Sequence, residues 1–152
     1  MKSVVFVCLG NICRSPMAEA IFNHLVDEAG LSNAITVSSR ATSTEEEGNP
    51  PHPGAQETMR RHGLDFTGFR SQPISKQDFE TADYIITMDQ QNVANLKRMA
   101  PAGTEQKIHL CLDIVPGHEG QEIPDPWYTH KFEYTYDLLM SALPSWLNKI
   151  SN

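Results

Sequence analysis

The stretch Ser3–Pro16, SVVFVCLGNICRSP, contains the features that decide the fold. Val4–Val7 is a continuous apolar run rich in β-branched residues, which is typical of a strand covered on both faces. Ser15 and Pro16 then supply a helix N-cap and a first-turn proline, and apolar residues recur at helical spacing until Gly30. A buried strand, a short loop and a helix are therefore expected in direct succession.

The rest of the chain repeats this alternation of strands and helices. Further strands are expected at Ile35–Ser39, Tyr84–Met88 and Ile108–Leu112. Helices are expected at Ala55–His62, at Ser75–Phe79, between Asp89 and Pro101, and from about Lys131. Pro144 is expected to break or restart the last helix. Four strands alternating with helices predict an α/β fold, in which a parallel sheet carries helices on both faces, in one domain of residues 1–152.

The composition excludes several classes of protein. Of the 152 residues, 39% are hydrophobic and 20% are charged, which is not the composition of a disordered chain. No apolar run approaches the ~20 residues that cross a bilayer. The 12 Lys and Arg against 19 Asp and Glu give a formal charge of -7, which offers no general attraction for nucleic acid phosphates. We therefore expect neither a membrane nor a nucleic acid as a partner.

The three cysteines, Cys8, Cys13 and Cys111, indicate a reducing compartment, because a secreted protein rarely leaves an odd thiol. No secretion leader precedes the first strand, and we expect a cytoplasmic protein. The cysteines cannot form a four-ligand zinc site by themselves, and the histidines have no metal-like spacing. No metal and no cofactor are expected.

Ligands of open parallel sheets bind beyond the carboxyl ends of the strands. The segments that follow those ends are Cys8–Ser15, Ser39–Gly54, Met88–Asn92 and the loop around Asp125. The first of them runs from a buried strand into a helix, so its successive backbone N–H groups can surround an anion at the positive helix terminus. Those groups belong to Leu9, Gly10, Asn11, Ile12, Cys13 and Ser15, and Gly10 is expected to adopt the positive φ of a curled loop.

The side chains of this loop favour nucleophilic attack on an oxyanion. A thiol placed like Cys8, beside an arginine and a helix N-terminus, is readily ionised and nucleophilic. Arg14 has the planar fork that suits two phosphate oxygens and the charge of a phosphoryl-transfer transition state. The alternative interpretation is a buried strand cysteine followed by a surface arginine.

A second group must protonate the leaving oxygen, because a phenolate or alkoxide leaves poorly without a proton. Asp125, which lies between Pro124 and Pro126, is the best source of that proton. Trp127 and Tyr128 follow it and can hold an aromatic ring. The alternative interpretation is a proline-rich turn with a solvated aspartate.

These motifs resemble those of the low-molecular-weight protein tyrosine phosphatases over nearly the whole chain. The matching segments are Val5–Glu19, Ala41–Ser43, Gly48–Pro51, Met88–Asp89 and Asp125–Tyr128. The resemblance implies a parallel sheet with strand order 2-1-3-4. It also implies Cys8 as nucleophile, Arg14 as phosphate and transition-state ligand, and Asp125 as general acid and then base. Finally, it implies Ser15 as hydroxyl donor to the Cys8 sulfur, and Asn11 and Ser39 as residues that order the loop.

We therefore expect a metal-independent enzyme that hydrolyses phosphotyrosine in proteins or peptides through a cysteinyl-phosphate intermediate, binds phosphate and similar oxyanions, and acts as a monomer. Two competing functions remain. A related thiol-dependent arsenate reductase uses two more cysteines, but this chain offers only Cys13 and Cys111, and none between Gln77 and Gln90. The other competitor is a phosphotyrosine-binding module that has lost turnover.

Two departures from the family pattern and one extra thiol carry further expectations. Phe69 stands where many members have a His that bonds to the cysteine loop, and Glu45 stands where an aromatic wall residue is common. Glu45 is therefore expected to form an acidic lip of the cleft that favours basic residues beside the phosphotyrosine. Cys13 is expected to resolve an oxidised Cys8 if their Cα atoms lie within about 4.4 to 6.8 Å, the alternative being that it only packs beneath the loop.

Overall fold

The computed structural model, which describes all 152 residues, has at its centre the strand β1 (Lys2–Cys8). Its residues Val4–Val7 are 0–3% exposed, as expected for a strand covered on both faces. β1 pairs with β2 (Ile35–Ala41) on one side and β3 (Tyr84–Thr87) on the other, and β3 pairs with β4 (Ile108–Leu110). All pairs are parallel and the order is β2-β1-β3-β4, which confirms the predicted α/β fold and its 2-1-3-4 sheet.

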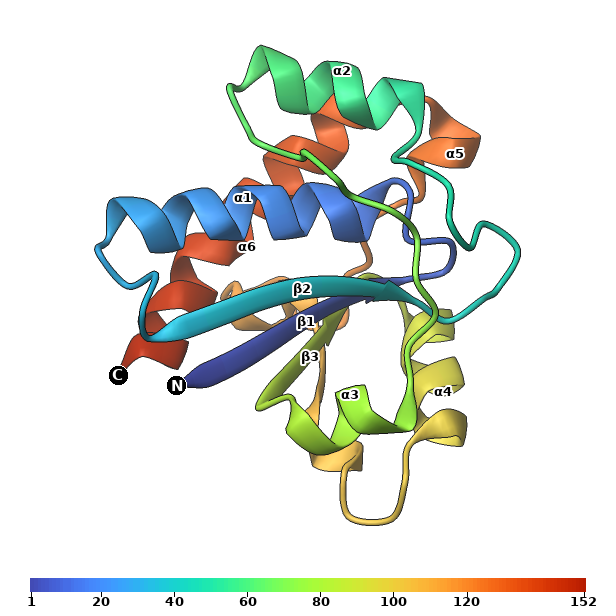
Figure 1. The fold of residues 1–152 in the computed structure, drawn as a ribbon, viewed down its shortest axis with the longest axis vertical. Coiled ribbons are helices and arrows are strands. Elements are labelled where there is room, and N and C mark those ends of the chain that lie inside the picture. Colours follow the sequence, from blue (N-terminus) through green and yellow to red (C-terminus); the bar gives the residue numbers. More distant parts are fainter.

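Helices cover both faces of this sheet (Figure 1). Val4 and Phe6 of β1 belong to the larger core cluster, which contains residues of α1 (Arg14–Glu28) and α6 (Phe132–Ser151). Val5 and Val7 point the other way and pack with residues of α3 (Lys76–Thr81) and α4 (Gln90–Met99). Each fully buried side chain of this size contributes about 1.5 to 3 kcal/mol of hydrophobic free energy, so the alternation along β1 fixes both layers.

The remaining elements are short and lie mostly at the ends of the sheet. They are α2 (Pro53–Arg61), η1 (Glu105–Lys107), η2 (Cys111–Ile114) and α5 (Pro126–Thr129). In Figure 1, α5 lies beside the N-terminal end of α2. None of the helices combines the length and the apolar character that crossing a membrane requires.

Three elements differ from the prediction. The strand expected at Ile108–Leu112 ends at Leu110, because a 3-10 helix begins at Cys111. The backbone carbonyl of Cys111 accepts a hydrogen bond from Trp146 Nε1 at 2.8 Å. The short helix α5 was expected as a loop. The expected break at Pro144 is also wrong, because α6 runs through it without interruption.

The continuity of α6 has a packing explanation. A proline inside a helix costs about 3 kcal/mol, because it removes one backbone hydrogen bond and crowds the preceding turn. Against this, the inner face of α6 is fully or almost fully buried at Leu139, Ala142, Leu143, Trp146 and Ile150. At about 1.5 to 3 kcal/mol for each large side chain, this burial outweighs the cost of the proline.

The register of the sheet brings the candidate segments to one edge. Cys8 pairs with Ala41 of β2, and Val7 pairs with Thr87 of β3, so the three strands end at the same level. The loop after Cys8, the segment after Ala41 and Met88–Asp89 therefore start side by side. The backbone N–H of Ile123 donates to the carbonyl of Met88 at 2.9 Å, which brings the chain before Asp125 to the same edge.

Candidate active site

The loop Cys8–Ser15 curls at the start of α1, and its unusual backbone residue is Asn11. Asn11 has a φ of 58°, whereas Gly10 does not adopt a positive φ, so the expectation for Gly10 is wrong. Asparagine tolerates this left-handed conformation better than most residues. Its buried amide also compensates the strain, because Nδ2 donates to Ser15 Oγ at 2.8 Å and to Ser39 Oγ at 2.9 Å, while Oδ1 accepts from Gln72 N at 3.0 Å.

Ser15 lies inside this network and not at the helix cap. α1 begins at Arg14, with Cys13 at the N-cap position and no side-chain cap, so the prediction of Ser15 as N-cap is wrong. The Ser15 hydroxyl lies 3.0 Å from Cys8 Sγ, and the Ser15 N–H also points at this sulfur, at 3.4 Å. Because Asn11 donates to Ser15 Oγ, the hydroxyl hydrogen of Ser15 is free to point at the sulfur. The sulfur of Cys8 thus faces two donors.

Arg14 is held from one side and open on the other. Its Nη1 donates to Asp89 Oδ2 at 2.8 Å and to the carbonyl of Ile123 at 2.9 Å, whereas Nη2 lies 3.4 Å from Asp125 Oδ2. Burial alone lowers the pKa of this guanidinium, but Cys8, Asp125 and Asp89 outweigh burial and the pKa is raised. Arg14 is 2% exposed, which rules out a surface arginine, and its buried Nε has no protein partner. Along the edge formed by Nε and Nη2, the protein contact is the long one from Nη2 to Asp125 Oδ2, so an oxyanion can bind there.

Asp125 lies across the pocket from the loop, at the N-cap of α5. Its Oδ1 accepts a hydrogen bond from the Trp127 N–H at 3.0 Å. Its side chain is 22% exposed and lies near Arg14, so it is not the freely solvated aspartate of a turn. Its other oxygen, Oδ2, accepts a longer hydrogen bond from Arg14 Nη2 at 3.4 Å.

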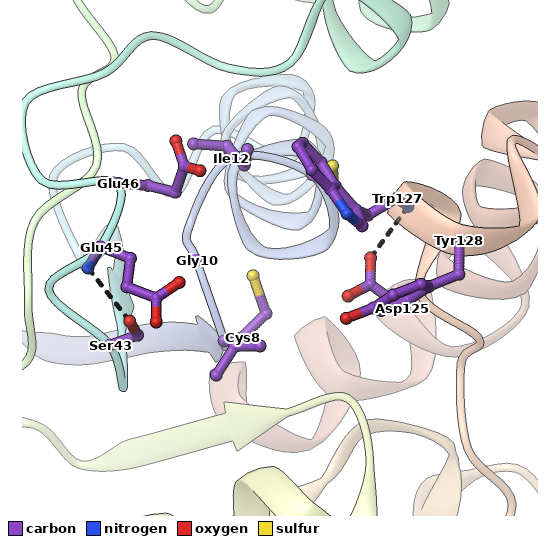
Figure 2. Close-up of a pocket in the computed structure, with 11 residues that line it drawn as sticks. Cys8, Gly10, Ile12, Ser43, Glu45, Glu46, Asp125, Trp127 and Tyr128 are labelled. Atoms are coloured by element: carbon purple, nitrogen blue, oxygen red, sulfur yellow. Dashed lines mark hydrogen bonds between the residues drawn. The ribbon is translucent and has the colours of Figure 1, made fainter.

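Cys8 and Asp125 line one pocket, which is formed by the loop after β1, the segment after β2 and the segment that begins at Asp125 (Figure 2). Figure 2 shows Glu45 and Glu46 on one side of the Cys8 sulfur, and Asp125, Trp127 and Tyr128 on the other. The complete lining is Cys8, Leu9, Gly10, Ile12, Cys13, Ser43, Glu45, Glu46, Asp125, Trp127 and Tyr128. Trp127 is 49% and Tyr128 73% exposed, so these rings form a wall that is open to a ligand. Asn11 and Ser15 do not line this pocket; their side chains support the loop from behind.

Two of the lining residues are absent from the sequence-based prediction. Ser43 Oγ accepts from the Glu45 N–H at 3.1 Å and fixes the turn that carries Glu45. The Glu46 side chain lies against Gly10 and accepts from Asn49 Nδ2 at 2.7 Å. Their position directly after Ala41–Thr42, at the carboxyl end of β2, is the signal that could have identified them.

Ser39 connects the loop network to a buried carboxylate. Its hydroxyl donates to Glu19 Oε1 at 2.6 Å, and burial raises the pKa of Glu19, opposed by this hydrogen bond and by Arg40. Phe69 has no polar group to offer to the loop and packs against the core. Glu19 and the backbone N–H of Gln72 complete the hydrogen bonds of Ser39 and Asn11, and neither contact was predicted. The signal for Glu19 is its spacing four residues after Ser15 on the buried face of α1.

Cys13 and Cys111 are free thiols, and each is buried. Burial, followed by the neighbouring Cys8, raises the pKa of Cys13 far above that of an ordinary thiol. Burial likewise raises the pKa of Cys111 to about 12. The chain contains no group of three His, Cys, Asp or Glu side chains that are placed to hold a metal ion. The pocket therefore combines one thiol facing two donors, an arginine edge and a carboxyl group, which suits attack on a tetrahedral oxyanion.

Sequence comparison places relatives along almost the entire chain. The sequence profile of a family described as low molecular weight phosphotyrosine protein phosphatase matches residues 3–152. The low molecular weight protein-tyrosine-phosphatase YfkJ of Bacillus subtilis (strain 168) is 43% identical over 150 residues, which cover 99% of this chain and 96% of YfkJ. The low molecular weight phosphotyrosine protein phosphatase of Gallus gallus is 39% identical over 154 residues, which cover 98% of this chain and 96% of the relative.

Solved structures agree with the sequence matches. The crystal structure of YfkJ from Bacillus subtilis superimposes with a TM-score of 0.95 at 43% identity and covers 99% of this chain and 95% of that chain. The crystal structure of DARP, a drosophila arginine phosphatase, superimposes with a TM-score of 0.90 at 34% identity and covers 100% of this chain and 99% of that chain. The fold and the sequence pattern are thus shared along the full length of these proteins.

Proposed function

Because this chain belongs to the low molecular weight phosphotyrosine protein phosphatase family, we propose that it hydrolyses phosphotyrosine in proteins or peptides through a cysteinyl-phosphate intermediate. Protein tyrosine phosphatases of this family are phosphomonoester hydrolases, and this chain is one of them. The observation that supports the mechanism is that Cys8 and Asp125, from distant parts of the chain, line one pocket, and that Arg14 of the Cys8 loop contacts the Asp125 carboxylate. The free thiols are compatible with the reducing cytoplasm, where we propose that the enzyme works.

In the first step, the Cys8 sulfur attacks phosphorus and the phosphorus–oxygen ester bond breaks. The leaving phenol oxygen takes a proton from Asp125, which lines the pocket. Arg14 binds two phosphate oxygens through Nε and Nη2, the edge that Asp89 and Ile123 leave open. Backbone N–H groups of the loop bind the remaining charge.

In the second step, water attacks the phosphorus of the cysteinyl-phosphate. The phosphorus–sulfur bond breaks, Cys8 leaves as a thiolate, and Asp125 accepts the proton of the water. The two donors of Ser15 stabilise the departing sulfur. The cycle returns Asp125 to its protonated form and releases inorganic phosphate without a metal ion.

The depth of the pocket favours phosphotyrosine over phosphoserine. Cys8 is 3% exposed and lies below the exposed rings of Trp127 and Tyr128. A phosphotyrosine side chain is long enough to span this wall, and its ring can pack against the two aromatic residues. A phosphoserine is too short to reach the sulfur while its backbone stays outside. Glu45 and Glu46 on the opposite side favour a peptide that carries basic residues.

Steady-state phosphate release tests this function. The purified protein is assayed with p-nitrophenyl phosphate, with phosphotyrosine and phosphoserine peptides, and with a phosphoarginine peptide, because the similar DARP is an arginine phosphatase. We expect turnover to be fastest with phosphotyrosine and absent in Cys8→Ser, which retains vanadate binding since the backbone loop is unchanged. Binding of phosphotyrosine without turnover would support the phosphotyrosine-binding module. Faster cleavage of phosphoarginine would show that phosphoarginine, and not phosphotyrosine, is the preferred substrate.

Arsenate reduction is assayed in parallel. A relay through further cysteines needs thiols that ionise and exchange readily. Cys111 has a pKa raised to about 12 and is 0% exposed, so it is unsuited to such a relay. We therefore expect no thiol-dependent arsenate reduction, and its appearance would contradict the assignment.

A further inference from the structure

One residue outside the pocket contacts both of its walls. The backbone N–H of His52 donates to the carbonyl of Ile12 in the anion-binding loop, at 2.8 Å. The ring of His52 meets the ring of Trp127 edge to face, with centroids 5.5 Å apart and an interplanar angle of 83°. His52 does not line the pocket, so it acts on neither substrate nor sulfur directly. It connects the loop of Cys8 to the wall that follows Asp125.

The imidazole of His52 is itself held in place from two directions. Its Nδ1 accepts a hydrogen bond from the Gly54 N–H at 3.0 Å and caps α2. One face of the ring stacks on Phe132, with centroids 5.1 Å apart and an interplanar angle of 24°. Phe132 approaches this closely because residue 54 is glycine: a Cβ there would lie 2.4 Å from the Phe132 ring. The start of α2 and the start of α6 thus orient His52 toward Trp127.

The segment that His52 contacts has little stability of its own. α5 comprises only Pro126–Thr129, and a helix of one turn is not stable in isolation. Its Trp127 is half exposed, and the aromatic contact that the structure gives for Trp127 is the one with His52. The same Trp127 donates its backbone N–H to Asp125 Oδ1. The position of the Asp125 carboxyl group therefore depends on how firmly Trp127 is docked.

We propose that His52 is a positioning residue, which keeps the Asp125–Trp127 segment docked against the anion-binding loop. The inference rests on the proposed function, since it matters only if Asp125 protonates the leaving group. A loosened Asp125 penalises substrates whose leaving group needs that proton, such as phosphotyrosine. It has little effect on an aryl phosphate with an activated leaving group, such as p-nitrophenyl phosphate.

Two substitutions separate this role from helix capping. His52→Asn keeps a good N-cap and removes the ring, whereas His52→Phe keeps a ring and removes the cap. We expect His52→Asn to retain the melting temperature within a few degrees. It should lose about 2- to 10-fold in kcat/KM for the phosphotyrosine peptide, as the loss of one aromatic pair predicts, and less than 2-fold for p-nitrophenyl phosphate. We expect His52→Phe to lower the melting temperature and to keep the ratio of the two kcat/KM values.

His130→Asn is the matched control. His130 lies at the other end of α5 with a φ of 61°, a conformation that asparagine tolerates, and no aromatic contact is found for it. His130→Asn should leave unchanged the kcat/KM for both substrates and the quenching of tryptophan fluorescence by acrylamide, which is described below. This control removes any general effect of replacing a histidine beside α5.

Tryptophan fluorescence gives a readout that is independent of activity. Trp146 is 3% exposed and serves as the constant background, whereas Trp127 is 49% exposed. Acrylamide should quench His52→Asn more strongly than the parent protein, and His52→Phe to about the same extent. This comparison uses the folded protein without substrate.

The proposal is rejected if His52→Asn keeps its full kcat/KM on phosphotyrosine, or if both substrates lose activity equally. It is also rejected if His52→Phe loses the same selectivity as His52→Asn, because the retained ring would then not matter. A parent protein that hydrolyses neither substrate would instead contradict the proposed function, and the fluorescence comparison would still test the docking of Trp127.

Discussion

Arg14 Nη1 lies 2.8 Å from Asp89 Oδ2, and this ion pair joins the start of α1 to the N-cap of α4. The other oxygen of Asp89 accepts the N–H of Asn92 at 2.8 Å, so one carboxylate caps a helix and anchors the arginine. The side chain of Arg14 is 3% exposed and that of Asp89 is 20% exposed. Because Nη1 is bound on this side, the guanidinium presents its other edge to the pocket.

Replacement of Asp89 should therefore reduce both stability and catalysis. In Asp89→Ala a buried guanidinium loses the nearer of its two carboxylate partners and α4 loses its cap, and we expect a loss of about 2 to 4 kcal/mol in the free energy of unfolding. The kcat should fall at least tenfold, because Arg14 no longer faces the phosphate in one orientation. Asp89→Asn keeps an acceptor for the cap and should be the milder variant in urea unfolding and in assays. Equal effects of the two variants would contradict a role for the charge.

Asp125→Ala should show a dependence on the leaving group. Asp125 is placed to donate a proton through Oδ2, since Oδ1 accepts the Trp127 N–H at 3.0 Å and the contact of Oδ2 with Arg14 Nη2 is longer, at 3.4 Å. We expect a loss of about 10²- to 10⁴-fold in kcat/KM with phosphotyrosine and a clearly smaller loss with an activated aryl phosphate. The comparison of the two substrates is the measurement. Equal losses with both would reject the role of Asp125 as general acid.

The local patterns of the sequence predict the sheet and the segments at its carboxyl edge, whereas the strand order is implied by the family resemblance. The apolar run of β1 needs no partner to be recognised, and the same holds for the strand-to-helix transition after Cys8. The choice of Asn11 over Gly10 for the left-handed position was missed, because it depends on Ser39 and Gln72, which lie far along the chain. Hydrophobic periodicity and the spacing of motif residues do not indicate such long-range contacts.

The same reason explains the other omissions. The partners of Arg14 are 75 and 109 residues away at Asp89 and Ile123, and the second of them is a backbone carbonyl that has no sequence signature. The sequence predicts a helix that starts at Asp89, which is a local feature, but the contact of Asp89 with Arg14 is tertiary. Pro144 was misjudged because the burial of α6 outweighs a local propensity. Of the predicted pocket residues, Cys8 and the loop after it are identified by the end of a strand, whereas Asp125 is identified by its position between two prolines.

Glu19→Gln tests the buried carboxylate behind the loop. Burial raises the pKa of Glu19 above its ordinary value of 4.5. The folded protein therefore holds this proton to higher pH than the unfolded chain, and its free energy of unfolding falls as the pH rises from about 4.5 through the folded-state pKa. We expect Glu19→Gln, which cannot ionise, to be less sensitive to pH than the parent protein between pH 4 and 7 in urea unfolding.

The exposed Glu47 provides the control for this experiment. Glu47→Gln should follow the pH profile of the parent protein, because no buried carboxylate is removed. If the free energy of unfolding of Glu19→Gln changes with pH in parallel with that of the parent protein, the ionisation of Glu19 is not coupled to folding. The amide of Glu19→Gln keeps an oxygen for Ser39, so a loss of activity is not required by this prediction.

Cys13→Ser tests the protection of Cys8 against oxidation. Peroxide converts a thiolate into a sulfenic acid, and a second thiol can condense with it to a disulfide and water before further oxidation. Cys13 lines the same pocket as Cys8. Its raised pKa means that capture is slow at neutral pH and faster at higher pH, because the thiolate is the attacking form.

When the peroxide exposure is made above neutral pH, where capture by Cys13 is faster, we expect dithiothreitol to restore activity to the parent protein and largely to fail with Cys13→Ser. The fraction of activity recovered after equal exposure is the measurement, and mass spectrometry identifies the disulfide or the sulfinic acid. Cys111→Ser serves as the control, because this buried thiol lies in the core and outside the pocket. Equal recovery in Cys13→Ser and the parent protein would leave Cys13 with a packing role only.

Glu45→Ala tests the acidic side of the pocket. Figure 2 shows the Glu45 carboxylate reaching toward the pocket from the side opposite Tyr128, where residues that flank a phosphotyrosine would pass. An exposed charge pair contributes about 0.2 to 1 kcal/mol, so the parent protein should prefer a basic over an acidic peptide by about 1.5- to 5-fold in kcat/KM for each such contact. Glu45→Ala should reduce this ratio, and added salt should reduce it in the parent protein in the same direction. Glu47 belongs to the same acidic run but lies outside the pocket, so Glu47→Ala should leave the ratio of the kcat/KM values for the basic and acidic peptides unchanged. If both substitutions change this ratio equally, the general negative charge of the protein, and not Glu45, selects the peptide.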